Sequence, residues 1–271
     1  MATLRLITYN MLDAPGDRLD TLTAVVQRLR PDVLACQEIT DIQGFLRLSA
    51  ALGMPGAIAQ ANGPEVMEAD RGQNLSKHKR EHVGLLSRYP IDAFCAHIGD
   101  PRILFRSVLE ARLEIPDLGS VRAFAVHLRA FPGPAGAHFK MREAEVVSAI
   151  LRQHADSPYR FILGDFNAWM RGEGELGNMD EHYPQDHIAA IRGEVTDCIR
   201  NSGVEDVWRL QGTDPQQIPS TVLGLGWRSS VDHIMVSPAL GRYLQRVFVP
   251  DDDLLRTASD HLPVVADFEW P

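Results

Sequence analysis

The sequence lacks the features that mark membrane-spanning, secreted and disulfide-stabilised proteins. None of its apolar runs approaches the length needed to cross a bilayer. Its three cysteines are an odd number without metal-type spacing, so we expect them to be reduced and structural. The chain enters a strand pattern directly after its first residues, which leaves no room for a signal peptide. These absences predict a cytoplasmic protein.

The sequence also lacks an excess of positive charge. Acidic residues outnumber Lys plus Arg by 36 to 27, which gives a formal net charge of −9. This balance argues against a broadly basic surface that coats nucleic acid, but it allows a local basic site. No internal repeat or linker divides the chain. With 271 residues, 45% of them hydrophobic, we expect one domain over residues 1–271 with a sizeable core.

Short apolar runs alternate with helical patterns along the chain. Apolar residues recur at helical spacing over residues 18–29, 42–52 and 140–154. An antiparallel strand pair is expected over residues 103–115 and 119–128. The mixture does not match a regular βαβ array. It favours a four-layered α/β sandwich, in which two mixed β-sheets pack face to face with helices outside.

Polar residues stand at the ends of nearly all the expected strands. The clearest case is residues 161–167, where Gly164 ends a buried strand and Asp165 and Asn167 follow. A carboxylate and an amide at this spacing can orient a water and hold an oxyanion, although an Asx turn explains the same residues. The full set is Asn10, Glu38, Glu81, His127, Asp165, Asn167, Asp232, Asp260 and His261. Oxygen donors without cysteine favour Mg²⁺ over zinc, so we interpret the set as an active site.

At these positions the sequence resembles the endonuclease/exonuclease/phosphatase superfamily, which includes deoxyribonuclease I. The matching motifs are residues 8–10 (Thr-Tyr-Asn), 37–38 (Gln-Glu), 84–91 (Gly-Leu-Leu-Ser-Arg-Tyr-Pro-Ile), 126–128 (Val-His-Leu), 164–167 (Gly-Asp-Phe-Asn), 231–234 (Val-Asp-His-Ile) and 259–261 (Ser-Asp-His). The resemblance covers nearly the whole chain. It implies the deoxyribonuclease I-like fold and metal-dependent hydrolysis of phosphate esters, without naming a substrate.

The resemblance implies where the metal ion and the attacking water bind. Glu38 matches the principal Mg²⁺ ligand, with Asn10 and Asp260 nearby in the metal and phosphate shell. Asp165 and Asn167 match the pair that positions or activates the water and binds the phosphate. Mn²⁺ is a possible substitute for Mg²⁺.

The resemblance also implies two histidine–carboxylate pairs at the phosphate. His261 matches the histidine that faces the scissile phosphate, and Asp232 matches the carboxylate that orients it. His127 resembles the second histidine, with Glu81 as its carboxylate partner. Arg106 stands where relatives of deoxyribonuclease I carry a phosphate-binding arginine.

Two segments depart from the pattern of abasic-site endonucleases. Residues 168–171 read Ala-Trp-Met-Arg, where that group commonly has Val-Ala-His. His127-Leu128 replaces its Tyr-x-Pro-Asn type segment. These differences count against an abasic-site endonuclease.

We therefore predict a Mg²⁺-dependent enzyme that hydrolyses phosphodiesters. Two alternatives remain open: a phosphomonoesterase acting on a nucleotide or phosphorylated small molecule, and a catalytically silent member that binds a phosphorylated ligand or a protein. The substrate could be a nucleotide, a nucleic acid or a phosphorylated small molecule, and no protein partner is evident. We expect the polar residues 168–192 to border the pocket and long duplex DNA to be a poor substrate. The basic run 77–80 could grip one or two phosphates of a compact ligand, although a solvated loop explains it as well.

Overall fold

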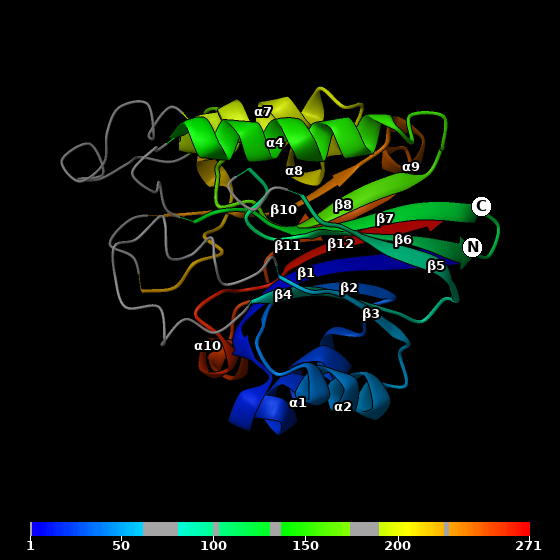
Figure 1. The fold of residues 1–271 in the computed structure, drawn as a ribbon, viewed down its shortest axis with the longest axis vertical. Helices are drawn as coiled ribbons and strands as arrows, with labels where there is room; N and C mark the ends of the chain where they lie inside the picture. The colour runs from blue at the N-terminus through cyan, green and yellow to red at the C-terminus, as the bar shows by residue number, and fades with distance from the viewer. Residues whose placement is uncertain (1, 62–80, 100–102, 131–136, 174–189, 225–227) are drawn as a thin grey trace.

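The computed structural model describes residues 2–61, 81–99, 103–130, 137–173, 190–224 and 228–271. These residues form four layers, with helices outside two facing β-sheets (Figure 1). The predicted four-layered α/β sandwich is confirmed. Within the described residues, no helix is both long enough and apolar enough to cross a membrane. Cys36, Cys95 and Cys198 are free cysteines.

The first sheet has six strands in the order β11-β12-β1-β2-β4-β3. Only β1 and β2 pair in parallel, and the other neighbours are antiparallel. The strands are β1 (Ala2–Ala14), β2 (Val33–Ile39), β3 (Gly56–Ala59), β4 (His82–Ser87), β11 (Leu244–Phe248) and β12 (Val264–Trp270). The outer face carries η1 (Gly16–Arg18), α1 (Leu19–Leu29), α2 (Ile42–Leu52) and α10 (Asp253–Ala258).

The second sheet also has six strands, in the order β5-β6-β7-β8-β10-β9. Here only β7 and β8 pair in parallel. The strands are β5 (Ile91–His97), β6 (Val108–Ile115), β7 (Gly119–His127), β8 (Arg160–Asp165), β9 (Glu205–Asp206) and β10 (Asp232–Val236). On this side of the molecule lie α4 (Ala137–Arg152), η3 (Ala190–Glu194), α7 (Val195–Arg200), α8 (Val207–Leu210), η4 (Pro215–Gln217) and α9 (Pro238–Gly241).

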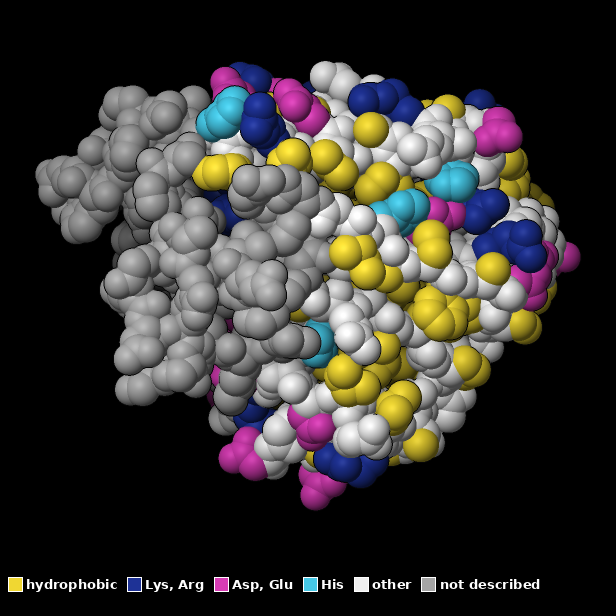
Figure 2. Space-filling view, in the orientation of Figure 1, with side chains coloured by type: hydrophobic (Ala, Val, Ile, Leu, Met, Phe, Trp, Pro, Cys, Tyr) yellow, Lys and Arg dark blue, Asp and Glu magenta, His cyan; other side chains and the backbone are white. Residues whose placement is uncertain are grey.

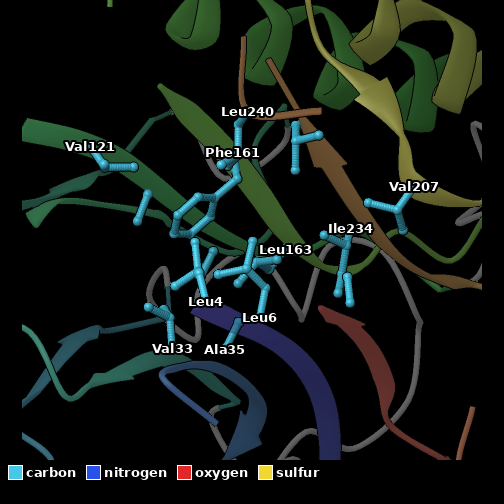
Figure 3. Close-up of a cluster of buried hydrophobic side chains, with 14 of the residues drawn as sticks. Leu4, Leu6, Val33, Ala35, Val121, Phe161, Leu163, Val207, Ile234 and Leu240 are labelled. Carbon is cyan, nitrogen blue, oxygen red and sulfur yellow. The ribbon is translucent and has the colours of Figure 1, made fainter. Parts of the chain in front are cut away.

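The main core fills the space between the two sheets. Leu4 and Leu6 of β1 meet Phe161 and Leu163 of β8 there, as Figure 3 shows. The residue after Leu6, Ile7, belongs to a second core, beneath α1 and α2, because successive side chains of a strand point to opposite faces. Both faces of the central strands are therefore buried, which explains why they read as continuous apolar runs.

The topology brings the polar strand ends to one edge of the sandwich. Strands β1, β2, β7 and β8 finish at this edge, whereas β10 and β12 run antiparallel to their neighbours and begin there. Asp165 at the end of β8 is consequently in register with both His127 and Asp232. The two chain termini lie at the opposite end, where Ala2 pairs with Trp270 (Figure 1).

Several local predictions differ from the structure. The strand expected from residue 103 begins only at Val108, because the backbone amide of Phe105 donates to Glu143 Oε1 at 3.0 Å instead of joining a strand. Strand β5 and helix α10 were not predicted. Residues 62–80 lie outside the described part of the chain.

Gly164 lies where β7 and β8 approach too closely for a side chain. A β-carbon there would be 2.2 Å from the carbonyl oxygen of Val126, which is backbone and cannot rotate away. We expect Gly164→Ala to lower the free energy of unfolding by about 1–3 kcal/mol, as overpacked sites do. Denaturant unfolding measures this change.

Gly99→Ala is the control, because the nearest atom to a β-carbon at Gly99 is Leu104 Cβ at 3.5 Å. We expect this variant to change the free energy of unfolding by less than about 0.5 kcal/mol. Equal stability of the two variants would contradict the close approach of β7 and β8.

Candidate active site

The amide of Asn10 connects the two sheets at the polar edge. Its Nδ2 donates to Glu38 Oε1 at 3.0 Å and to Asp165 Oδ2 at 3.1 Å. Its Oδ1 accepts a hydrogen bond from the backbone amide of Leu12, which fixes the amide plane. Asn10 is fully buried, so these bonds are shielded from water. One residue thus aligns the predicted metal ligand with the predicted water-activating carboxylate.

Two residues of the site have left-handed backbone conformations that are uncommon outside glycine. Glu38 has φ 58° at a register shift between β2 and β4, and Asn167 has φ 47° just after β8. The surroundings hold Asn167 in place: its backbone amide donates to Asp165 Oδ1, and its side chain donates to the carbonyl of Leu128. Such strained residues concentrate at functional sites.

Asp232 and His261 form a buried pair. His261 Nδ1 donates to Asp232 Oδ2 at 2.8 Å. The backbone amide of His261 donates to Ser259 Oγ, and that hydroxyl donates to the carbonyl of Asn10. The imidazole orientation is therefore tied to the same residue that bridges the sheets. The second oxygen of Asp232, Oδ1, is buried without a hydrogen-bond partner.

The two histidines of the site have opposite charge preferences. Burial disfavours the charged form of His261, but the Asp232 carboxylate outweighs burial and raises the pKa of His261 to about 10. Burial, followed by the charges of Arg106 and His261, holds the pKa of His127 well below its usual range. Burial, followed by the Asp232 carboxylate, raises the pKa of Asp165 to about 7. At neutral pH the site contains an imidazolium at His261 and a neutral imidazole at His127.

The environment of Glu81 differs from the predicted pairing with His127. Glu81, Glu38 and His127 have ligand atoms within 4.8 Å of one another, but Glu81 is hydrogen-bonded to Arg106 through Nε at 3.0 Å and through Nη2. A guanidinium forms stronger charge-assisted bonds to a carboxylate than a neutral imidazole does. The carboxylate nearest to His127 Nε2 is instead Asp165 Oδ2, at 3.5 Å. His127 Nδ1 is buried without a hydrogen-bond partner.

The structure surrounds Arg106 with acceptors from the protein itself. Besides Glu81, the guanidinium donates to the carbonyl of Leu128 at 3.2 Å. Its charge is therefore compensated before any phosphate binds. Asp260, predicted near the metal, is exposed and adjacent in sequence to His261, with Ser259 Oγ 3.5 Å from its Oδ1.

The donor set of the site fits a divalent metal ion. Besides the group that contains Glu38, a second group of Asp165, Asp232 and His261 has ligand atoms within 4.8 Å of one another. Burial is the main cause that raises the pKa of Glu38. The positive charge around this carboxylate is therefore too small to offset the cost of burying it. Carboxylate oxygens are the ligands that Mg²⁺ prefers. Glu38, with the carboxylates that face it, would hold such an ion.

Lys140 and Glu143 also support the site, although we did not predict them. Lys140 is buried and its Nζ donates to the carbonyl of Asn167. Glu143, one turn later on α4, accepts from the backbone amides of Phe105 and Arg129. A sequence signal exists: Lys140 occupies the stripe that continues through Ala144, Val147 and Leu151, where a solvated lysine is not expected.

Two predicted segments are described only in part. Residues 174–189, within the polar segment 168–192, and the basic run 77–80 lie outside the described part of the chain. The start of the polar segment packs into the core, with Trp169 buried and its Nε1 donating to Ser229 Oγ at 3.1 Å.

Comparisons with known proteins agree on the fold over the full length of the chain. Residues 7–261 match the model of the Endonuclease/Exonuclease/phosphatase family. No curated protein matches the sequence.

Solved structures share the fold at low identity. The 3′ phosphatase NExo from Neisseria, bound to a product DNA hairpin, is 21% identical with a TM-score of 0.72, covering 98% of this chain and 100% of that one. An AP endonuclease from Archaeoglobus fulgidus is 18% identical with a TM-score of 0.72, at coverages of 98% and 100%. A mannosyl-6-phosphatase from Bacteroides thetaiotaomicron is 16% identical with a TM-score of 0.65, again at 98% and 100%. Because the family model matches residues 7–261, the chain belongs to the endonuclease/exonuclease/phosphatase family.

Proposed function

We propose that this protein is a Mg²⁺-dependent phosphoesterase that hydrolyses a phosphodiester by attack of water. The observation that carries the proposal is the link through Asn10, which joins Glu38, Asp165 and the Asp232–His261 pair at one edge. Membership of the family supports phosphoester hydrolysis. The free thiols suit the reducing cytoplasm, where we place the activity.

Each side chain of the site has a role that follows from its charge. Glu38 would hold the metal ion, with Asn10 and Asp260 beside it, and a bound divalent ion supplies positive charge that stabilises phosphoryl oxygens. Asp165 accepts the proton of the attacking water, and a pKa of about 7 suits a general base at neutral pH. Asn167 positions that water and the phosphate.

The two histidines act on the phosphate in different ways. His261 uses Nδ1 for Asp232, so its Nε2 is left to donate to a phosphoryl oxygen as a cation. His127 is neutral, so it can accept a proton or donate a hydrogen bond near the leaving oxygen. Glu81 acts on the site indirectly by holding Arg106 in place.

The positive side chains near the site are already bonded to acceptors of the protein, and this favours a diester over a monoester. A diester carries one negative charge, whereas a monoester at neutral pH carries up to about two, as phosphorylated side chains do. Arg106 is bonded to Glu81, and Lys140 donates to the carbonyl of Asn167, so the protein itself already compensates part of both charges. The phosphomonoesterase remains the second candidate, because two of the similar structures carry phosphatase names.

A panel of substrates separates the candidates. We expect a small phosphodiester to give a higher kcat/KM than the matching phosphomonoester at equal Mg²⁺ and salt. Plasmid DNA should be the poorer diester, because tight duplex binding requires many phosphate-neutralising cations and the chain carries a net charge of −9. Preference for the monoester would establish the second candidate, and no turnover of any ester would establish the silent one.

Removal of the metal ion tests the role of Glu38. We expect chelation to abolish hydrolysis and Mg²⁺ or Mn²⁺ to restore it. Glu38→Gln should keep the fold but require a higher Mg²⁺ concentration for half-maximal rate, because a charged ligand is lost. Glu145→Gln, on the exposed face of α4, is the matched control and should behave as the wild type. Full activity in excess chelator would contradict the proposal.

The Asp232–His261 pair predicts a pH dependence. His261 has a raised pKa, so its charged form persists as pH rises and is lost through about pH 10. Asp232→Asn removes the carboxylate that raises this pKa, and the alkaline limb of kcat should therefore move toward neutral pH. His261→Ala should lower kcat by at least about 10²-fold.

His138→Ala, an exposed histidine of α4, is the control for both variants. Wild-type pH–rate profiles in Asp232→Asn would show that His261 does not act as a cation.

A further inference from the structure

A cluster of metal-binding side chains lies on the second sheet, outside the active site. It consists of Cys95 and His97 on β5, Glu110 on β6 and His154 just beyond α4. We propose that Cys95, His97 and Glu110 bind a zinc ion and that His154 moves in as the fourth ligand. In Figure 2, histidine side chains reach the surface beside acidic and basic ones, just below the helices of the upper layer.

The strand register explains why these residues meet. Cys95 and His97 are two residues apart on β5, so their side chains point to the same face. Cys95 pairs directly with Glu110 across to β6, and Glu110 pairs with Phe124 on β7. The His154 ring packs against Phe124, with the ring centroids 5.8 Å apart. Three adjacent strands and the segment after α4 thus converge on Glu110.

The distances between donor atoms suit tetrahedral coordination. With the usual zinc–sulfur, zinc–nitrogen and zinc–oxygen bond lengths, neighbouring donors of a tetrahedron are about 3.3–3.6 Å apart. Cys95 Sγ is 3.5 Å from His97 Nε2 and 3.8 Å from Glu110 Oε2. Glu110 Oε2 is 2.8 Å from His97 Nε2 and 3.2 Å from His154 Nε2. Cys95, His97 and Glu110 have their ligand atoms within 4.8 Å of one another and need shifts of a few tenths of an ångström to close around an ion. His154 is close to Glu110 but lies outside this group, so its ring must move toward Cys95 and His97 to complete the tetrahedron.

The second oxygen of Glu110 is held by a cation from the neighbouring strand. Arg122 Nη1 donates to Glu110 Oε1 at 2.7 Å, whereas Oε2 faces Cys95 and His97. His154 Nε2 is shared between the two oxygens, 3.1 Å from Oε1 and 3.2 Å from Oε2. Such outer contacts orient metal ligands in known sites. Glu110 is 5% exposed, whereas Cys95 is exposed and the histidines are half-buried, so an ion can enter from solvent.

The donor types distinguish this cluster from the candidate Mg²⁺ site. Thiolate and imidazole favour zinc, whereas Mg²⁺ prefers oxygen and dehydrates reluctantly. On binding, the Cys95 thiol loses its proton to solvent and its sulfur becomes a ligand. The bound ion would fasten β5, an edge strand, to β6 and to the end of α4.

In the competing interpretation the cluster is an ordinary hydrogen-bond network. Glu110 would then be satisfied by Arg122, His97 and His154, and Cys95 would be an exposed free thiol. The two interpretations differ in one property: only a metal site requires the sulfur of Cys95 to form a bond.

Titration with Co²⁺ in excess Mg²⁺ tests the proposal through that sulfur. We expect about one equivalent of Co²⁺ to produce thiolate-to-cobalt charge-transfer absorption, since the ligands we assign around Glu38 are oxygen and nitrogen donors. Zn²⁺ should abolish the band by displacing Co²⁺. Cys95→Ser should remove the band, and His154→Ala should weaken Co²⁺ binding by at least about tenfold.

Cys198→Ser is the matched control, because Cys198 is partly buried and contacts Ser148 rather than this cluster. It should retain the full band. Zinc should also raise the Tm of the wild type and of Cys198→Ser, but not that of Cys95→Ser. Absence of the band in the wild type, or its persistence in Cys95→Ser, would overturn the proposal.

Discussion

The hydrogen bonds of the Asn10 amide are the interaction on which the site depends. Asn10 lies in the carboxyl-terminal half of β1, and its amide reaches Glu38 in its own sheet and Asp165 in the facing one. Its backbone carbonyl accepts from Ser259, which in turn fixes the backbone of His261. The relative position of metal ligand, general base and cationic histidine therefore follows from how the two sheets pack at this edge. The packing of the core between the sheets therefore also determines the geometry of the site.

The site places several negatively charged side chains in the buried part of the protein, away from water. Asp165 and Asp232 are both almost fully buried and in register with each other across β8 and β10. Two carboxylates in this arrangement repel, and the charged His261 offsets only part of that repulsion. The rest of the repulsion is visible in two features. Asp232 Oδ1 has no hydrogen-bond partner, and the pKa of Glu38 is raised. The buried site thus has more negative than positive charge, and a divalent cation would compensate the difference.

The sequence predicts the parts of this arrangement that follow from one strand at a time. Asp165, Asn167 and His261 stand next to apolar runs, so their place at strand ends could be inferred, and the family resemblance supplied their grouping. The Glu81–Arg106 pair could not be inferred, because it depends on which side chains meet after β4 and β6 are placed. Strand β5 was missed since its residues are mostly exposed and carry no alternating pattern. Helix α10 was missed because six residues are too few for helical periodicity.

Lys140 shows how the helical layer takes part in the site. A lysine in the buried stripe of α4 is costly, and burial lowers its pKa to about 8. The compensating contact is the carbonyl of Asn167, the residue whose left-handed backbone turns the chain away from Asp165. Glu143 meanwhile accepts hydrogen bonds from the backbone amides of Phe105, next to Arg106, and of Arg129, which follows β7. Helix α4 therefore stabilises the strained turn after β8. The left-handed backbone of Asn167 is held by its hydrogen bond from the buried Lys140 as well as by the contacts within the turn.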